Sequence, residues 1–573
     1  MTSASPRPAF DPSGPWSRHY EHPSEWDMRF PPLSLPDMFL SSALRFGPRP
    51  LLDFMGRRYS YTRVAEGVRR FAAGLQAMGV GKGDRVGLFL PNVPHYLAAY
   101  YGALLAGATV VNFSPLYTVD ELNHQVEDSG ARLLVTLSAT ALLPAAFKVL
   151  QGSSLERLIV GSVAGVLPPV KSLAYRLFKR AERVDIPDDP RITRFSSLID
   201  NAGYVAAPLI DPEQDVALIQ YTGGTTGTPK GARLTHQNLT ANARQVNAID
   251  PEQDREDRIL GVLPFFHVFA NTAVLNRTVL NGGQIVMLPR FDAAQALAAV
   301  RRTRVTAMPG VPTMYQALLD HPDMARTDWS SLRVCISGGA PMAAELKARF
   351  EAATGSKLVE GYGLTESAGV VSCNPYESGG RSGTIGQPIP ATMVRLVDKE
   401  DPTRPAPDGE PGEIVVAGPQ IMQGYWNRPE ADADSFVRLE SGDWLRTGDV
   451  GTIDSDGYIR IVDRLKDMIA VGGFKVYPST IETLLYAHPA VKEALVIGVP
   501  DAYRGESPRA YVTLNAEAPG VSAADLTHWL NDQLGKHERV DAVVIRDSMP
   551  KTMIGKLDRK ALRAEIASQD VGE

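Results

Sequence analysis

Tyr221-Thr-Gly-Gly-Thr-Thr-Gly-Thr-Pro-Lys-Gly231 gathers four threonines and four glycines around one lysine, just after the apolar run Val216-Ala-Leu-Ile219. A strand that opens into a Gly/Thr loop brings backbone N–H groups and hydroxyls close to a phosphate chain. Glycine is needed there because a Cβ would keep the backbone away from the ligand. The stretch therefore predicts a phosphate-binding loop, and the alternative is a flexible turn between two elements.

The other common phosphate loop, G-x-x-x-x-G-K-[ST], does not fit these residues. Pro229 precedes Lys230 and Gly231 follows it, so no serine or threonine stands where that loop holds its metal ion. This departure disfavours an ATP-hydrolysing motor or a kinase.

Three further clusters suit the remaining parts of a nucleotide. In Gly361-Tyr-Gly-Leu-Thr-Glu-Ser367 an aromatic between two glycines could lie on adenine, and Glu366 suits Mg²⁺, which favours one or two carboxylates plus substrate phosphates. Leu332-Arg-Val-Cys-Ile-Ser-Gly-Gly-Ala-Pro341 ends a strand in a turn that lets a flat ring approach the backbone. Asp449, closing Trp444-Leu-Arg-Thr-Gly-Asp449, suits the two hydroxyls of a ribose. A capped turn is the alternative for the first of these.

Together with Lys556 in Met549-Pro-Lys-Thr-Met-Ile-Gly-Lys-Leu-Asp-Arg559, these clusters resemble the signatures of the adenylate-forming enzymes: acyl-CoA synthetases, luciferases and peptide-synthetase adenylation domains. Most members carry serine where this chain has Gly223. Finer stretches resemble bacterial long-chain fatty acid–CoA ligases: Pro115-Leu-Tyr-Thr118, Leu263-Pro-Phe-Phe-His-Val-Phe-Ala270, Asp328-Trp-Ser-Ser-Leu332 and Ser372-Cys-Asn-Pro-Tyr376.

The resemblance implies that a fatty acid carboxylate attacks the α-phosphate of ATP, and that the thiol of coenzyme A then attacks the acyl-adenylate. It implies that Lys556 bridges carboxylate and α-phosphate, that Mg²⁺ sits on Glu366, and that His267 lies between the nucleotide and acyl pockets. The remaining implied positions are the phosphate ligands Thr222, Gly223, Gly224, Thr225, Thr226 (also a catalytic candidate), Gly227, Lys230 and Thr365; the adenine neighbours Gly339, Ala340, Gly361, Tyr362 and Gly363; the ribose ligands Asp449 and Arg464; the hinge Lys466; and Gly472 and Gly473 beside the pantetheine arm of coenzyme A.

An apolar tunnel must hold the acyl chain. We expect it to be lined from Val311 to Tyr315, around Met342, and from Ala368 to Val371. Each buried methylene contributes about 0.8 kcal/mol, so an open tunnel favours medium or long chains.

The order of elements predicts the fold. Helical and strand-like runs alternate from Pro36 onward, which favours α/β units with a largely parallel sheet. The charge cluster Asp463-Arg-Leu-Lys-Asp467 marks a boundary, giving a large body over residues 1–465 and a small mobile α/β domain over residues 466–573. Residues 1 to about 35 are expected to form an arm on the body.

Composition excludes several classes of protein. A net charge of -6 gives no sign of nucleic-acid binding. Two cysteines, Cys335 and Cys373, cannot form a disulfide framework or a metal site alone, which predicts an intracellular protein. No export signal is recognised, and residues 93–113 are interpreted as a buried helix and strand rather than a membrane span.

Residues 170–184 predict a basic amphipathic helix. Lys171, Arg176, Lys179, Arg180 and Arg183 oppose an apolar face, and only Glu182 offsets them. Such a helix can lie in a membrane interface, although an ordinary solvated surface helix is the commoner case. The expected location is cytoplasmic, with peripheral contact at the inner membrane face left open, as is a homodimer.

Two alternatives to the fatty acid–CoA ligase stay open. One passes the adenylate to a carrier protein or uses another carboxylic acid. The other is a lipid-binding or membrane-recruitment protein that has lost activity.

Overall fold

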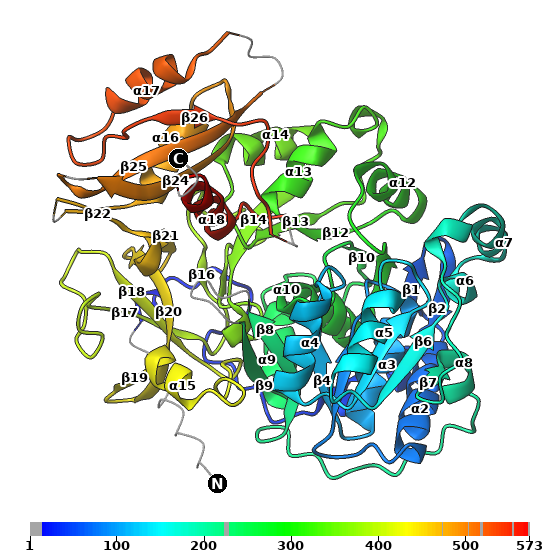
Figure 1. Ribbon diagram of the computed structural model, residues 1–573. Helices are drawn as coiled ribbons and strands as arrows, with labels where there is room; N and C mark the ends of the chain where they lie inside the picture. The colour runs from blue at the N-terminus through cyan, green and yellow to red at the C-terminus, as the bar shows by residue number, and fades with distance from the viewer. Residues whose placement is uncertain are drawn as a thin grey trace.

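The computed structural model describes residues 14–222, 229–472, 474–501, 503–515, 520–552 and 555–570. Four sheets with helices packed around them form a large body and a smaller C-terminal unit, which caps one end of the body in Figure 1. Two of the sheets are mainly parallel, and both belong to the body.

The first mainly parallel sheet has the order β7-β6-β5-β3-β4-β8-β9, in which only β9 runs antiparallel to its neighbour. Its strands are β3 (Arg85–Leu88), β4 (Thr109–Asn112), β5 (Leu133–Leu137), β6 (Arg157–Gly161), β7 (Ile192–Arg194), β8 (Val216–Thr222) and β9 (Lys230–Thr235). The helices of this part are α2 (Tyr61–Ala77), α3 (Pro94–Leu105), α4 (Val119–Ser129), α5 (Leu143–Gly152), α6 (Val163–Val166), α7 (Pro169–Phe178), α8 (Phe195–Leu198) and α9 (His236–Ala248).

The second sheet has the order β16-β15-β14-β13-β12-β10-β11-β1-β2, and it is parallel from β14 to β1. Its strands are β1 (Pro50–Phe54), β2 (Arg57–Ser60), β10 (Arg258–Gly261), β11 (Gln284–Met287), β12 (Ala307–Gly310), β13 (Val334–Gly338), β14 (Lys357–Tyr362), β15 (Ser372–Cys373) and β16 (Gln387–Pro388). Its helices are α1 (Leu35–Phe46), α10 (Val268–Ala270), a π-helical turn (Asn271–Asn276), α11 (Arg277–Asn281), α12 (Ala293–Thr303), α13 (Pro312–Leu319) and α14 (Ala344–Thr354).

The third sheet is antiparallel and closes the body. It contains β17 (Met393–Val397), β18 (Gly412–Ala417), β19 (Phe436–Leu439), β20 (Gly442–Ile453) and β21 (Ile459–Arg464), with α15 (Pro429–Ser435). The arm that precedes α1 packs on this part, because Trp26 is buried and its Nε1 donates to the carbonyl of Thr392 at 3.0 Å.

The C-terminal unit has its own apolar cores, separate from the core of the body. It contains β22 (Ile469–Val471), β23 (Phe474–Val476), β24 (Val491–Asp501), β25 (Gly505–Leu514) and β26 (Val543–Ile545), with α16 (Pro478–Tyr486), α17 (Ala523–Asn531) and α18 (Arg559–Asp570). The large core reaches Ile461 and the small one begins at Ile469. The predicted boundary at residues 465 and 466 falls between them and stays a prediction.

The predicted α/β fold with parallel sheets and a small C-terminal domain is confirmed. Residues 93–113 form α3 and β4, and no helix within the described ranges is long and apolar enough to cross a membrane. The predicted helix over residues 170–184 is too long, because α7 ends at Phe178. Beyond it, the Thr140 hydroxyl donates to the carbonyl of Ala181 and the Thr140 backbone N–H donates to the carbonyl of Glu182, which ties the chain to the neighbouring loop.

Candidate active site

A cavity of about 340 Å³ lies at the carboxyl ends of β12, β13 and β14, next to the β8–β9 hairpin. Parallel strands end at the same edge of a sheet, which is where ligands bind in open α/β folds. Twelve of the predicted site residues line it: Thr222, Lys230, His267, Gly339, Gly361, Tyr362, Gly363, Thr365, Glu366, Arg464, Lys466 and Lys556. Predicted positions Gly223, Gly224, Thr225, Thr226, Gly227 and Gly473 lie outside the described residues.

Thr222 and Lys230 bring the phosphate-binding hairpin to this cavity. They end β8 and begin β9, and their backbones pair across the hairpin. The ammonium of Lys230 lies 5.1 Å from the centre of the Tyr425 ring. The hydroxyl of Tyr425 donates to Glu366 Oε1 at 2.7 Å, so one aromatic side chain connects the lysine and the carboxylate.

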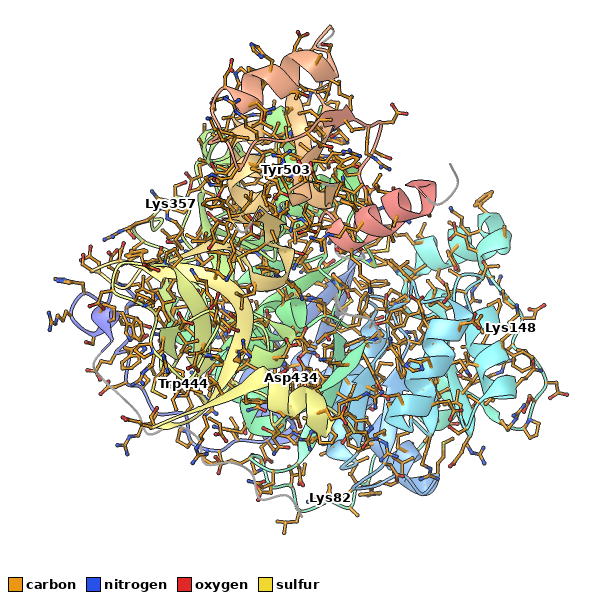
Figure 2. The ribbon with its side chains drawn as sticks, turned by 60° about the vertical axis from the view of Figure 1, so that its left-hand side comes forward. Lys82, Lys148, Lys357, Asp434, Trp444 and Tyr503 are labelled. Atoms are coloured by element: carbon orange, nitrogen blue, oxygen red, sulfur yellow. The ribbon has the colours of Figure 1, made fainter. Side chains whose placement is uncertain are left out.

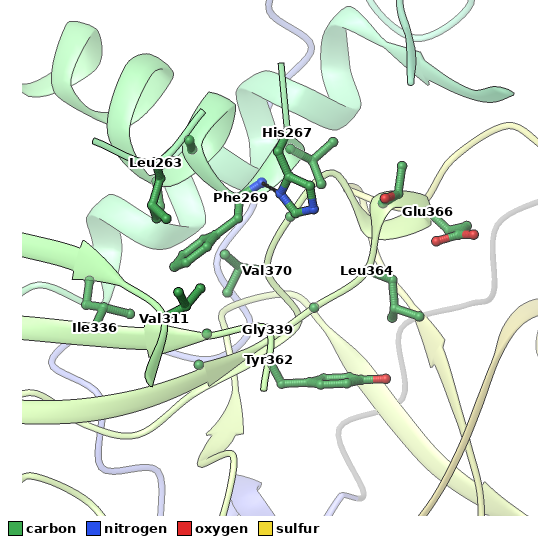
Figure 3. Close-up of a pocket in the computed structure, with 18 of the residues that line it drawn as sticks. Leu263, His267, Phe269, Val311, Ile336, Gly339, Tyr362, Leu364, Glu366 and Val370 are labelled. Atoms are coloured by element: carbon green, nitrogen blue, oxygen red, sulfur yellow. Dashed lines mark hydrogen bonds between the residues drawn. The ribbon is translucent and has the colours of Figure 1, made fainter. Parts of the chain in front are cut away.

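Tyr425 lines the cavity but was not predicted from the sequence as a site residue. It belongs to Gly424-Tyr-Trp-Asn-Arg428, a short run of aromatic and polar residues between β18 and α15. The aromatic pair in that run was the available signal. Among the described residues, Glu366 Oε2 has no protein partner, and Glu366 lines the cavity (Figure 3).

Tyr362, Asp449 and Arg464 form one hydrogen-bonded group. The Tyr362 hydroxyl donates to Asp449 Oδ2, and Arg464 Nε lies 2.9 Å from Asp449 Oδ1. Burial and the neighbouring carboxylate raise the pKa of the Tyr362 phenol, so it stays protonated. Asp449 is 2% exposed and does not line the cavity itself, so Arg464 and Tyr362 stand between it and a ligand.

A Cβ on either of two glycines in the cavity wall would meet a neighbouring atom at less than 3 Å. A Cβ on Gly363 would lie 2.1 Å from the carbonyl oxygen of Gly369, so the turn after Tyr362 requires glycine. Gly339 has a φ of +82°, and a Cβ there would lie 2.3 Å from Lys556 Cε and 2.6 Å from its Nζ. The Gly338-Gly339 turn thus admits the lysine, whereas the sequence suggested only the approach of a flat ring. Neither Ala340 nor Gly472 lines the cavity.

Lys556 reaches the cavity from the C-terminal unit. Lys551 and Leu557 pair in an antiparallel bridge on either side of it, Gly555 has a φ of +82°, and Lys556 N donates to Thr552 Oγ1 at 3.1 Å. Thr313 Oγ1 of the body donates to the carbonyl of Gly555 at 3.1 Å and fixes the turn. Desolvation and the nearby Arg464 lower the pKa of the Lys556 ammonium to about 8, while Asp449 opposes the shift.

His267 caps the start of α10 in the cavity wall, across from Tyr362 in Figure 3. Its Nδ1 accepts from the backbone N–H of Phe269 at 3.3 Å. Burial, followed by the positive charge of Lys556, lowers its pKa to about 3, so the imidazole is neutral. With Nδ1 as acceptor, Nε2 carries the proton and is the available donor.

One arm of the cavity is apolar. Of the expected tunnel residues, Val311, Gly369 and Val370 line it, whereas Met342 and Tyr315 do not; the Tyr315 hydroxyl instead donates to the carbonyls of Met308 and Ile336. The sequence missed the other wall, which is Val246, Ile249, Leu263, Phe269, Ala270, Ala273, Ile336, Cys373 and Tyr376. This wall can hold an acyl chain or an aromatic acid.

Comparison with known proteins identifies the family. Residues 39–426 match the family described as AMP-binding enzyme, and residues 480–556 match the AMP-binding enzyme C-terminal domain. The chain belongs to the AMP-binding enzyme family. This assignment confirms the resemblance stated from the sequence clusters.

The similar members of the AMP-binding enzyme family have names that refer to different acids. The chain is 38% identical to a long-chain-fatty-acid–CoA ligase of Bacillus subtilis (strain 168), over 96% of this chain and 98% of the relative. It is also 38% identical to a feruloyl-CoA synthase of Amycolatopsis, over 89% of this chain and 94% of that relative. The structure of ATP-bound MatB from Rhodopseudomonas palustris matches with a TM-score of 0.80 at 28% identity, over 93% of this chain and 99% of MatB. The structure of apo MatB matches over the same fractions of the two chains with a TM-score of 0.71.

Proposed function

We propose that the chain is an ATP-dependent fatty acid–CoA ligase that works through an acyl-adenylate and gives acyl-CoA, AMP and pyrophosphate. The observation that carries this proposal is the position of Lys556, beside Gly339 in a cavity that also contains Glu366 and an apolar arm. The relatives named as long-chain-fatty-acid–CoA ligases match nearly end to end, which supports a fatty acid and coenzyme A as the substrates.

The first half-reaction joins two anions. A carboxylate must approach the α-phosphate of ATP, and at 4 Å each pair of unit charges repels by about 4 kcal/mol at an effective dielectric of 20. An ammonium between the reacting groups offsets this repulsion, because preorganised charge is worth most in a water-poor site. Lys556 is the cation that lies nearest the Gly339 turn, and the neutral His267 adds an N–H donor on the acyl side.

The remaining groups have complementary roles. Thr222, Lys230 and Thr365 would bind the phosphates with the threonines and glycines of the β8–β9 loop, and the Tyr362–Asp449–Arg464 group would bind base and ribose. Glu366, with one oxygen held by Tyr425, has the single-carboxylate chemistry that Mg²⁺ accepts beside substrate phosphates. Mg²⁺ bound there would neutralise phosphate charge.

The second half-reaction needs a different arrangement of the same site. The thiol of coenzyme A attacks the acyl-adenylate carbonyl, and AMP leaves. We infer that the C-terminal unit rotates about Lys466, which removes Lys556 and brings Gly472 to the cavity. The higher TM-score with ATP-bound than with apo MatB supports the view that the present arrangement suits adenylate formation.

That rotation would break the polar contacts between the body and the C-terminal unit. Those that cross the boundary include Thr313–Gly555, Lys475–Glu400 at 3.2 Å and the bond from the Ser479 backbone to Asp463 at 2.9 Å. By contrast, Asp467 pairs with Arg559 and Arg563 of α18 and would move with the C-terminal unit.

Product analysis across a panel of acids tests the proposal. With ATP, Mg²⁺ and coenzyme A, we expect medium- and long-chain fatty acids to yield equal amounts of AMP, pyrophosphate and acyl-CoA. A carrier protein in place of coenzyme A, and ferulate in place of the fatty acid, test the alternative acceptor and the alternative acid. ADP as product, or no acid-dependent pyrophosphate, would contradict the proposed activity.

We also propose that α7 contacts an anionic membrane surface. Its apolar side chains point to solvent: Val170 is 81% exposed, Leu173 60%, Leu177 56% and Phe178 83%. Lys171 and Arg176 belong to the same helix and Lys179 and Arg183 follow it in the chain, and α7 stands at the edge of the body, far from the C-terminal unit (Figure 1). Apolar side chains ringed by cations are typical of interfacial helices.

Leu177 and Phe178 are exposed and do not support the fold, so replacing them tests vesicle binding by α7. Replacing Leu177 and Phe178 with aspartate is expected to weaken binding to vesicles rich in anionic lipid by at least about tenfold, because apolar insertion and charge attraction are both reduced. Tyr204→Asp with Leu209→Asp, at two other exposed positions, is the matched control and should bind as the unmodified chain does. Identical flotation of both double variants would rule out lipid contact at α7.

A further inference from the structure

A second cavity, of about 620 Å³, lies on the other side of α9 from the active-site cavity. Val246 and Ile249 line the active-site cavity, whereas Arg244, Asn247 and Ala248 line the second one. Its volume is in the range of small-molecule sites.

Four arginines converge on this cavity: Arg29, Arg45, Arg49 and Arg244. Aromatic rings position three of them, since the guanidinium carbons of Arg45 and Arg49 each lie 5.0 Å from the centre of the Phe46 ring and that of Arg244 lies 5.6 Å from Phe30. Stacking of this kind leaves the N–H edges of a guanidinium available to an anion.

The positive charge of the cavity is poorly balanced within the part of the chain that the structure describes. Arg244 bonds to the carbonyls of Thr240 and Pro31 and to Gln237, all of them neutral groups. No ion pair involves Arg29, Arg45 or Arg49 within the described ranges, and Asp254 is the one acidic residue in the described lining. Burial lowers the pKa of Arg244 to about 10, which leaves it charged at neutral pH.

Two amide groups in the lining have unused hydrogen-bonding atoms. Asn281 is 8% exposed; its Oδ1 accepts from the backbone of Gly283 at 3.0 Å, but its Nδ2 has no partner among the described residues. Within the same ranges, Asn247 Oδ1 has none either. Buried polar atoms are nearly always satisfied by protein, water or ligand, so these two side chains leave unused hydrogen-bonding capacity in the same lining as the four arginines.

We propose that this cavity is a second binding site, for a small molecule that carries a phosphate or pyrophosphate group. Arginine edges and the Asn281 amide would bind the phosphate oxygens, because guanidinium groups form paired hydrogen bonds with phosphate. Met28, Phe46 and Leu280 supply apolar contact for the rest of the ligand. The ligand would touch α9, which also forms the acyl arm of the active site.

Titration calorimetry on the full chain tests this site. A non-hydrolysable acyl-adenylate analogue first fills the active site, and inorganic pyrophosphate, AMP and coenzyme A are then titrated separately. We expect at least one of them to bind, with affinity reduced at least about tenfold in Arg45→Gln/Arg49→Gln, a loss of about 1.4 kcal/mol. The matched control is Arg69→Gln/Arg349→Gln, which removes the same charge from exposed sites elsewhere and should bind as the unmodified chain does.

A second variant tests the role of the amide nitrogen of Asn281, which is unpaired within the described ranges. Asn281→Asp keeps an acceptor for Gly283 N and replaces the free amide with a negative charge, so it should also weaken the binding event at least about tenfold. Calorimetric traces that no cavity variant alters, with any of the three probes, would overturn the proposal. Loss of vesicle binding in Arg45→Gln/Arg49→Gln without a calorimetric effect would also overturn it and assign the arginines to a lipid surface.

Ligand binding at the second cavity can be tested separately from the proposed ligase activity. Acid-dependent pyrophosphate release is measured on the same preparations, and Arg45→Gln/Arg49→Gln should retain it in the absence of added ligand. A chain that releases no pyrophosphate yet shows arginine-dependent binding would contradict the ligase and support the second site.

Discussion

Lys556→Ala is expected to lower the rate of adenylate formation by about 100- to 1,000-fold, the usual loss when one preorganised charge or donor is removed from an active site. The methyl group of alanine cannot reach the cavity, so the carboxylate and the α-phosphate would meet without their bridging cation. Thioester formation from preformed acyl-adenylate should stay within about twofold, because the rotated arrangement withdraws Lys556 from the site. Pyrophosphate release and single-turnover thioester formation measure the two halves separately.

Lys551→Ala is the matched control for that experiment. Lys551 begins the same turn, but its ammonium pairs with Glu493 at 2.6 Å and does not line the cavity. Both half-reactions should survive this change. Equal loss of the two half-reactions in Lys556→Ala would refute the division of roles. Because only the protonated lysine can bridge two anions, adenylate formation at low ATP should also fall as the pH rises through about 8.

Gly472→Leu is expected to affect the other half-reaction. Gly472 has a φ of +56°, and a Cβ built on it meets no atom within 4 Å, so the present arrangement can hold a side chain at the cost of about 1–2 kcal/mol of backbone strain. After rotation, the leucine would occupy space that the pantetheine arm needs. We expect the thioester step to slow by about 100-fold, as displacement of a reacting group by about 1 Å can do.

Gly409→Leu is the matched control for Gly472→Leu. Gly409 also has a positive φ, of +78°, and also has no atom within 4 Å of a built Cβ, but it lies in the β17–β18 connection of the body. It carries the same strain without any predicted contact with coenzyme A. Unchanged turnover with coenzyme A in Gly472→Leu would contradict the assignment of this glycine to the thiol-binding path.

The local parts of the site were readable from the sequence because each is a short continuous run. Thr222, Lys230, Tyr362 and Glu366 all line the predicted cavity, and the spacing of glycines around them reflects real close approaches. Lys556 also lines the cavity, and its implied role as a bridge between carboxylate and α-phosphate stays a prediction. The contact partner of Lys556 was not predictable, since the body and the C-terminal unit meet only in three dimensions.

The acyl arm was harder to predict because α9 does not look like a core helix. Its sequence is largely polar, yet Asn242 and Gln245 are buried and bond to the carbonyls of Val370 and Pro390. These bonds satisfy the polar side chains, and α9 can therefore lie in the core with Val246 facing the cavity. Sequence periodicity recognises apolar stripes and not buried polar groups that have partners.

The C-terminal end of α7 also could not be predicted from the local sequence pattern. The helical spacing of apolar and basic residues continues from residue 178 to residue 184, but α7 ends at Phe178 and the segment beyond it is hydrogen-bonded to Thr140. In Figure 2, side chains drawn as sticks fill the space between neighbouring helices and strands. Tertiary contacts, which local pattern cannot encode, decide where an element ends.

Following the carboxylate oxygen tests the central claim most directly. A fatty acid labelled with a heavy oxygen isotope in its carboxylate is incubated with the chain, ATP, Mg²⁺ and coenzyme A, and the products are weighed by mass spectrometry. Attack of the carboxylate on the α-phosphate leaves one labelled oxygen on AMP after the thiol displaces it, and this is the predicted result. Unlabelled AMP, or label in pyrophosphate or phosphate, would contradict the acyl-adenylate route.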